Sequence, residues 1–210
     1  MEKYKFSGEH LNFRGHILKR IYNIATGKIG GWIEKEENLS QEGTCWIDGE
    51  AKVFGNAKVT ENARIFDNAI ICDSAEISGH AKIYGDAQIH GNVKISDYVE
   101  VFDTAKLYEE VKLTGQAKIF GNCIIGEYAE IGDNVCIYEN AVIGASFISD
   151  NVRIYGYGRA YGEATISDNV QIFDRAQVFS SAKISGNVKI CGNAKVHDMI
   201  KVCGDGCISD

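Results

Sequence analysis

The sequence predicts an all-β solenoid, and three observations support that prediction. An Ile, Val or Leu returns every six residues from Ile47 to Ile143, and after one step shorter by a residue the series continues from Ile148 to Ile208, interrupted only by Ala160. A small residue, most often Ala, stands two positions before these aliphatic residues. Gly, Asn and Asp, which tolerate positive φ, fill the positions between repeats. A repeat of six residues fits short strands joined by tight corners, in which each turn of the chain packs on its neighbours.

Residues 1–44 lie outside this repeat, and we expect them to form a small β-rich cap before a repeat domain at residues 45–210. Tyr4–Phe6 and Ile17–Ile24 alternate in polarity as short strands do, and Thr26–Gly31 has the composition of a turn. Such a cap would cover the open strand edges of the first coil.

The repeats resemble those of the hexapeptide-repeat proteins, whose motif has an aliphatic residue first and a small residue fifth. VFGNAK (Val53–Lys58) and IYGDAQ (Ile83–Gln88) match it, and the resemblance covers residues 45–210. It implies a single-stranded, left-handed parallel β-helix with three hexads per coil. Seventeen hexads before the short step and eleven after it make 28, or about nine triangular coils spaced by about 4.8 Å. The preceding segment GGWIEKEENLSQEG resembles a bacterial and phage-borne subgroup labelled as acyltransferases or polymer-forming proteins.

Three hexads per coil would bring every third outward residue onto the same face. One face then collects an aromatic residue from each of seven successive coils, namely Phe66, Tyr84, Phe102, Phe120, Tyr138, Tyr155 and Phe173. This sorting persists across the short step, which supports the register. Two interpretations remain open. Ring stacking between coils would stabilise the solenoid, whereas an exposed aromatic row is typical of a surface covered by a second copy or by another protein.

The resemblance to hexapeptide-repeat proteins also implies acyl transfer as an alternative function. In that family a His acts as general base on a hydroxyl or amine, the donor is acetyl-CoA or another acyl-CoA, and the site lies between subunits. His80 at a corner and His90 at an outward strand position are the candidates here, although neither has a catalytic motif beside it. No inserted loop interrupts the hexads to form a pocket. We therefore expect no catalytic residue and no cofactor.

The amino-acid composition excludes some classes of binding partner and indicates the cell compartment. The net charge of −7 argues against direct nucleic-acid binding, which needs a basic surface. It leaves a further alternative, an acidic rod that inhibits a basic, nucleic-acid-binding partner protein. Met1–Gly8 lacks the apolar run of a secretory signal, and no stretch has the length of a membrane span. The seven Cys follow the repeat, as expected for reduced thiols in a cytoplasmic protein.

Stacked acidic residues at the corners raise the question of a metal. Asp133, Asp150 and Asp168 fall on neighbouring coils, and stacked carboxylates can bind Ca²⁺. Corner acids more often accept backbone N–H bonds, so we expect no metal site.

The sequence thus favours a non-catalytic structural or partner-binding rod. We expect it to form a homo-oligomer, a dimer or trimer, through the aromatic row.

Overall fold

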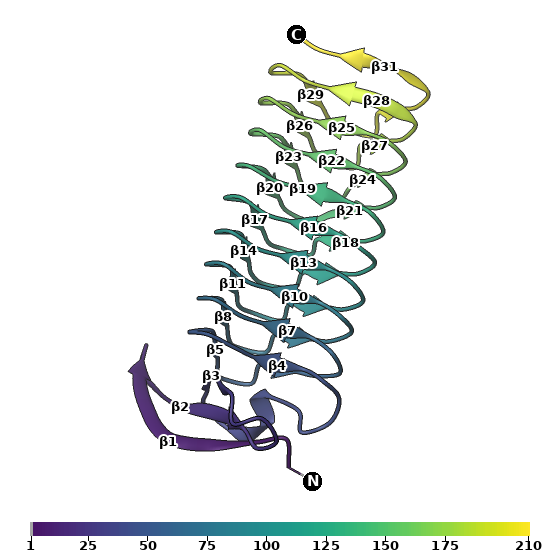
Figure 1. The fold of residues 1–210 in the computed structure, drawn as a ribbon. Helices are drawn as coiled ribbons and strands as arrows, with labels where there is room; N and C mark the ends of the chain where they lie inside the picture. The colour runs from purple at the N-terminus through teal and green to yellow at the C-terminus, as the bar shows by residue number, and fades with distance from the viewer. Residues whose placement is uncertain (1) are drawn as a thin grey trace.

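A computed structural model describes residues 2–210 and shows them as an elongated stack of coils (Figure 1). Two-residue strands alternate with tight corners, and nearly every strand pairs in parallel with the strand three positions along the chain. Lys82–Ile83, for example, lies between Arg64–Ile65 and Glu100–Val101, so one coil takes 18 residues. This confirms the predicted all-β parallel solenoid.

The coils form three parallel sheets, called faces A, B and C here. Face A comprises β5 (Lys52–Val53), β8 (Ile70–Ile71), β11 (Gln88–Ile89), β14 (Lys106–Leu107), β17 (Ile124–Ile125), β20 (Val142–Ile143), β23 (Arg159–Ala160), β26 (Gln177–Val178) and β29 (Lys195–Val196). Face B comprises β6 (Lys58–Val59), β9 (Glu76–Ile77), β12 (Lys94–Ile95), β15 (Lys112–Leu113), β18 (Glu130–Ile131), β21 (Ser146–Ile148), β24 (Ala164–Ile166), β27 (Lys183–Ile184) and β30 (Lys201–Val202). Face C comprises β4 (Trp46–Ile47), β7 (Arg64–Ile65), β10 (Lys82–Ile83), β13 (Glu100–Val101), β16 (Lys118–Ile119), β19 (Cys136–Ile137), β22 (Arg153–Ile154), β25 (Gln171–Ile172), β28 (Asn187–Ile190) and β31 (Asp205–Ile208).

The core is a set of columns that run the length of the stack. Aliphatic residues at the ends of the strands, such as Ile65, Ile83 and Ile119, are fully buried. The small residues two positions earlier, such as Ala63 and Ala81, are fully buried too. Burial of apolar surface contributes about 25 cal/mol per Å², so these columns are the main source of stability.

The short step predicted near Ala145 is a coil of 17 residues. β18 pairs with β21 so that Ile131 lies opposite Ile148, whereas Ile65 and Ile83 are 18 residues apart. Ser146 there takes the inward small position and is fully buried, with its hydroxyl unpaired among the described residues. The three faces therefore keep their register on both sides of the deletion.

The corner that follows face C alternates Gly with an acidic residue from coil to coil. Its members, all with positive φ, are Gly49, Asp67, Gly85, Asp103, Gly121, Glu139, Gly156, Asp174 and Gly192. The N–H of Gly85 donates to the carboxylate of Asp67 at 3.2 Å, and that of Gly121 donates to Asp103 at 3.1 Å. A Cβ on Gly85 would lie 2.9 Å from the backbone nitrogen of Asp103. The corner therefore has a period of two coils, because a carboxylate is needed on one and Gly on the next.

An antiparallel hairpin precedes the coils. β1 (Tyr4–Phe13) and β2 (His16–Asn23) turn at Arg14 and Gly15, which both have positive φ. β2 pairs with β3 (Ile29–Ile33), so face A continues outward through β3, β2 and β1. The short 3₁₀ helix η1 (Glu36–Asn38) follows. No helix of residues 2–210 combines the length and apolar character of a membrane span.

The parallel pairing begins earlier than the sequence repeat suggested. Within the segment expected as a cap, Trp32 and Ile33 of β3 pair in parallel with β5, and Leu39 forms a parallel bridge to Val59. Gly30 and Gly31 belong to β3 rather than to a turn. A Cβ on Gly30 would lie 2.7 Å from the Trp46 ring, so these glycines serve close packing of β3 on the first coil.

Candidate functional site

The seven predicted aromatic residues form one continuous stack on face C, called the aromatic ladder here. Consecutive ring centroids are 4.7–5.1 Å apart, and neighbouring ring planes differ by only 1–4°. Each ring projects from the position after an inward aliphatic residue, which places one ring on every coil. All seven side chains are half-buried. The five inner rings have a neighbouring ring on each face, so ring edges and tyrosine hydroxyls are what the ladder presents to solvent between its two end rings, Phe66 and Phe173.

This geometry limits what the ladder can bind. Nucleic-acid bases bind proteins by stacking on open ring faces, and both faces of the five inner rings are already occupied by other rings. Burial raises the pKa of Tyr84, Tyr138 and Tyr155, so their hydroxyls remain neutral donors at physiological pH. The ladder therefore suits a partner that packs against ring edges and accepts hydrogen bonds along a straight strip.

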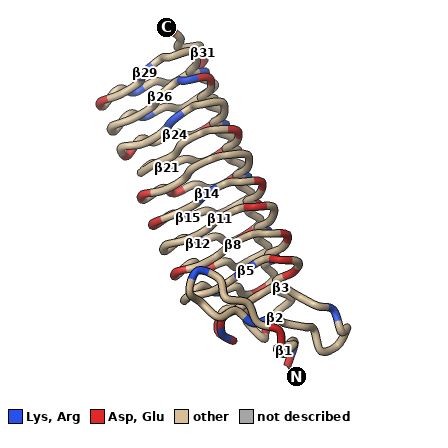
Figure 2. The backbone as a smooth tube through the Cα atoms, turned by 90° about the vertical axis from the view of Figure 1, so that its left-hand side faces the viewer, with Lys and Arg blue, Asp and Glu red and all other residues tan. Residues whose placement is uncertain are grey.

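A row of cations runs beside the ladder. The outward residue directly before the inward aliphatic residue of face C is basic in five coils, and this cationic column consists of Arg64, Lys82, Lys118, Arg153 and Lys189. Glu100 lies in the same row, 3.3 Å from Lys82 and 3.7 Å from Lys118. On the other side of the ladder lie the corner carboxylates, and Figure 2 shows acidic residues gathered at the corners of the stack. Face C thus carries cations, rings and carboxylates in three parallel rows.

The two histidine candidates do not form a catalytic arrangement. His80 stacks on Tyr98 with centroids 4.9 Å apart, at a corner. His90 stacks on Tyr108 with centroids 5.9 Å apart, on face A. Neither imidazole has a hydrogen-bonded carboxylate among residues 2–210.

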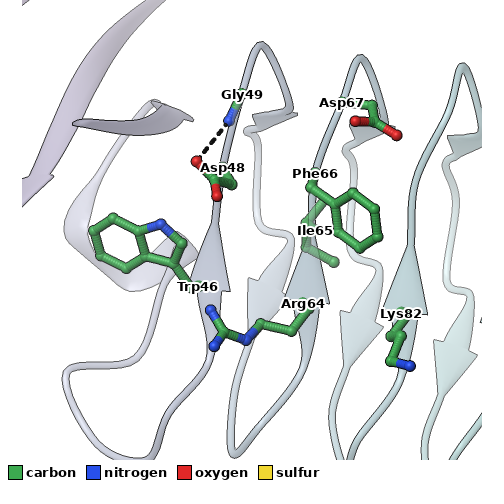
Figure 3. Close-up of a pocket in the computed structure, with 8 residues that line it drawn as sticks. All are labelled: Trp46, Asp48, Gly49, Arg64, Ile65, Phe66, Asp67 and Lys82. Carbon is green, nitrogen blue, oxygen red and sulfur yellow. Dashed lines mark hydrogen bonds between the residues drawn. The ribbon is translucent and has the colours of Figure 1, made fainter. Parts of the chain in front are cut away.

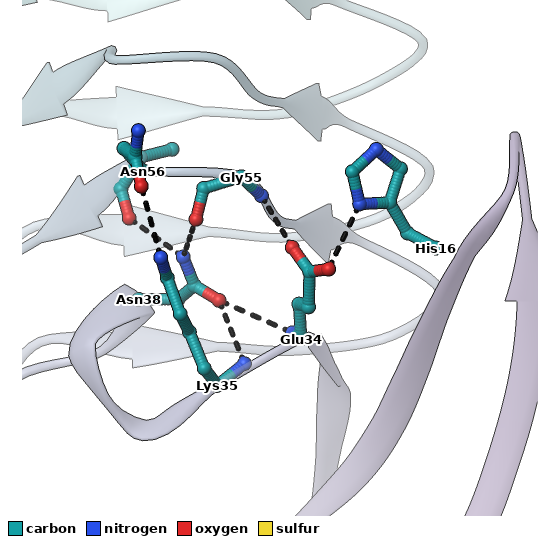
Figure 4. A network of polar contacts seen from close by, with 7 residues as sticks. His16, Glu34, Lys35, Asn38, Gly55 and Asn56 are labelled. Atoms are coloured by element: carbon teal, nitrogen blue, oxygen red, sulfur yellow. Dashed lines mark hydrogen bonds and ion pairs between the residues drawn. The ribbon is translucent and has the colours of Figure 1, made fainter.

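A different histidine does contact a carboxylate. His16 Nδ1 lies 2.9 Å from Glu34 Oε1 (Figure 4), and this hydrogen bond lowers the pKa of Glu34. The other oxygen of Glu34 accepts the N–H of Gly55 at 2.8 Å. Buried Asn38 accepts from the Lys35 N–H and donates to the Gly55 carbonyl. The network joins β2, the two residues that follow β3, and η1 to the first coil, so its role is structural. The sequence repeat does not reveal it because these residues lie before the regular hexads.

The corner acids form hydrogen bonds within the stack, and the cysteines are free thiols. The carboxylates of Asp133, Asp150 and Asp168 each accept a backbone N–H from the next coil, at 2.8–3.1 Å. No group of three His, Cys, Asp or Glu within residues 2–210 has an arrangement that could hold a metal ion. All seven Cys are free thiols. Burial raises the pKa of Cys72 to about 11 and that of Cys123 to about 12, which makes both poor nucleophiles.

Face C differs from the other two faces in the length of its aromatic row. Face A carries a shorter stack of Tyr161, Phe179 and His197, and face B carries mainly Ser and Thr at the equivalent positions. Comparison of the chain with protein-family models and with curated proteins gave no match. Face C, which carries the longest continuous stack of rings, is therefore the candidate functional surface.

Proposed function

We propose that this chain is a non-catalytic rod, a β-helix of the left-handed type, that self-associates through face C. The aromatic ladder is the observation that supports the proposal. Its ring edges form one straight apolar strip across seven coils, and soluble monomers seldom expose so large a continuous apolar surface. A structural or partner-binding role of this kind needs no metal and no cofactor.

The charges beside the ladder favour copies that point in the same direction. Rotation about an axis parallel to the rod brings the cationic column of each copy toward the ladder and acidic corner of the other. Rotation about an axis along the strands would place the two cationic columns against each other, and like charges in contact are unfavourable. A cyclic dimer or trimer with its axis along the rod satisfies this condition. The same cations argue against an acidic mimic of nucleic acid, whose surface would be uniformly negative.

The test is the absolute mass in solution, measured by light scattering over a concentration series. We expect the wild-type protein to have a multiple of the 23.1 kDa chain mass. Phe102→Lys and Phe120→Lys should each reduce that mass to 23.1 kDa, because a charge in the middle of an apolar interface costs several kcal/mol to bury. Phe179→Lys is the matched control, since it alters a stacked ring on face A.

Circular dichroism of each variant checks that the coils remain folded. A wild-type protein that stays monomeric at every concentration would contradict self-association. Equal masses for Phe102→Lys, Phe179→Lys and the wild type would show that the interface lies elsewhere.

A further inference from the structure

A recess of about 610 Å³ lies on face C where the aromatic ladder begins (Figure 3). This volume falls within the range of small-molecule sites. The recess opens to solvent between the coil of β4 and the coil of β7, next to the hairpin end of the stack. The lining residues that bear on binding are Trp46, Asp48, Arg64, Phe66, Asp67 and Lys82.

One wall of the recess is an aromatic ring with an uncovered face. Phe66 stacks on Tyr84 on one side, with centroids 4.7 Å apart and planes 4° apart. On the other side, the coil of β4 has Asp48 in the ladder position instead of a ring. The Asp48 carboxylate accepts the Gly49 N–H at 3.0 Å and pairs with Lys28. The ladder therefore stops one rung short of the first coil, and the space for another ring is open.

The recess also contains a cation without a partner. No carboxylate of residues 2–210 lies within ion-pair distance of the Arg64 guanidinium, whereas Lys82 pairs with Glu100. Figure 3 shows the Arg64 side chain reaching from β7 toward β4. Trp46 is 5% exposed, and its indole N–H has no acceptor among the described residues.

Both acidic side chains that line the recess are already engaged. Asp48 pairs with Lys28, and Asp67 accepts the N–H of Gly85 at 3.2 Å. Asp67 keeps its negative charge, but its carboxylate is turned to the Gly85 N–H. Arg64 is the charged group of the recess whose donors are unused, and its guanidinium presents a planar set of donors suited to a carboxylate.

We propose that this recess binds a small aromatic carboxylate. The ring of the ligand stacks on the open face of Phe66 as an additional rung of the ladder, and its carboxylate accepts hydrogen bonds from Arg64. The two requirements, a planar ring and one negative charge, follow from two separate features of the recess. The open face of Phe66 and the free Arg64 belong to a single chain, so the site is complete in one copy. Self-association through face C would compete with the ligand for Arg64, because it brings the cationic column toward the acidic corner of the second copy.

The test uses 2-naphthoate as the probe, with 2-naphthamide as its uncharged equivalent, in calorimetric titrations of the folded protein. We expect 2-naphthoate to bind at least 10-fold more tightly than 2-naphthamide, since a charge-assisted hydrogen bond contributes about a factor of ten or more. Tryptophan fluorescence, to which Trp32 and Trp46 both contribute, gives a second readout of binding.

Three variants separate the two features. R64Q should weaken 2-naphthoate about 10-fold and leave 2-naphthamide unchanged. F66L should weaken both compounds, because it removes the ring face and keeps an apolar side chain. D48F should abolish binding by placing a ring in the open rung while the coils stay folded.

Matched controls lie at the far end of the same two rows. R153Q belongs to the same cationic column and F173L to the last rung of the ladder, and both should leave affinity unchanged within about twofold. No binding of 2-naphthoate to the wild-type protein at about 1 mM overturns the proposal. An equal loss in R64Q and R153Q also overturns it, since it would show nonspecific attraction to the cationic column.

Discussion

Acidic residues at the corners combine an unfavourable backbone conformation with a favourable side-chain contact. Asp97 has φ +58°, and its carboxylate accepts the Gly115 N–H from the next coil at 2.9 Å. A residue other than Gly in this region costs about 1 kcal/mol or more, and Asp tolerates it better than most. The hydrogen bond offsets that cost. The same arrangement recurs with Asp67 and Asp103, which explains why acids and Gly share the corner positions.

Substitution of Asp97 should separate these two effects. We expect Asp97→Ala to lower the free energy of unfolding by about 1–2 kcal/mol, because Ala keeps the backbone strain and loses the hydrogen bond. Asp97→Gly should cost less than Asp97→Ala, because Gly relieves the strain. Chemical denaturation measures the differences, and Gln116→Ala at the neighbouring exposed corner position is the control. A larger loss for Asp97→Gly than for Asp97→Ala would show that backbone strain is not significant there.

At the scale of the strand, the sequence predicted most of the fold because the same pattern fixes burial and register. An inward aliphatic residue every six positions places one strand on each face, and three strands close a coil. The aromatic ladder followed from that register, since outward residues repeat with it. The prediction was least complete where the spacing changes. Ile33 and Leu39 are six residues apart, but the step from Leu39 to Ile47 is eight, so the repeat seemed to start later than the parallel pairing does.

Other features depend on side-chain conformation or on local charge and had no signal in the repeat. The recess beside Phe66 exists because Asp48 turns toward Gly49 and Lys28, which no spacing predicts. The net charge of −7 does not reveal the cationic column. Net charge sums over the whole chain, whereas the acids lie at the corners and the cations of face C lie on the strands. The contact of His16 with Glu34 joins residues 18 apart, one at the start of β2 and one directly after β3.

The tyrosines of the aromatic ladder should make the free energy of unfolding fall at alkaline pH. Burial raises the pKa of Tyr84, Tyr138 and Tyr155 above the ordinary value of 10.0. A raised pKa in the folded state means that the folded chain holds these protons more tightly than the unfolded chain. Their contribution to stability is therefore complete below pH 10 and is lost as the pH rises above it toward the folded-state values.

Replacement of all three tyrosines by Phe preserves the stack and removes the ionisable hydroxyls. We expect the triple variant to lose less stability than the wild type between about pH 10 and pH 11, as measured by denaturant unfolding at each pH. The control replaces three exposed tyrosines by Phe, namely Tyr98, Tyr128 and Tyr157. Parallel pH profiles for the wild type and the ladder variant would exclude the ladder as the source of the alkaline loss.

At the scale of the whole molecule, the core and the aromatic ladder have different sequence periods. The core repeats every six residues, because each strand supplies one inward column position, whereas the ladder repeats once per coil. In a solenoid each coil contacts only its neighbours, so whole repeats can be removed with limited effect on the rest. Deletions of different length can therefore leave the core intact and still change how the rings line up.

Two internal deletions use this difference to test whether alignment of the rings controls self-association. Removal of residues 103–120 takes out one coil and joins Phe102 to Gly121, so the remaining six rings stay on face C. Removal of residues 103–114 joins Phe102 to Gly115, keeps every inward position filled, and moves Phe120 with all later rings to face A. Both variants should fold by circular dichroism. We expect the first to keep the oligomeric mass in light scattering and the second to be monomeric. Equal masses would mean that the ladder stabilises each coil and does not form the interface.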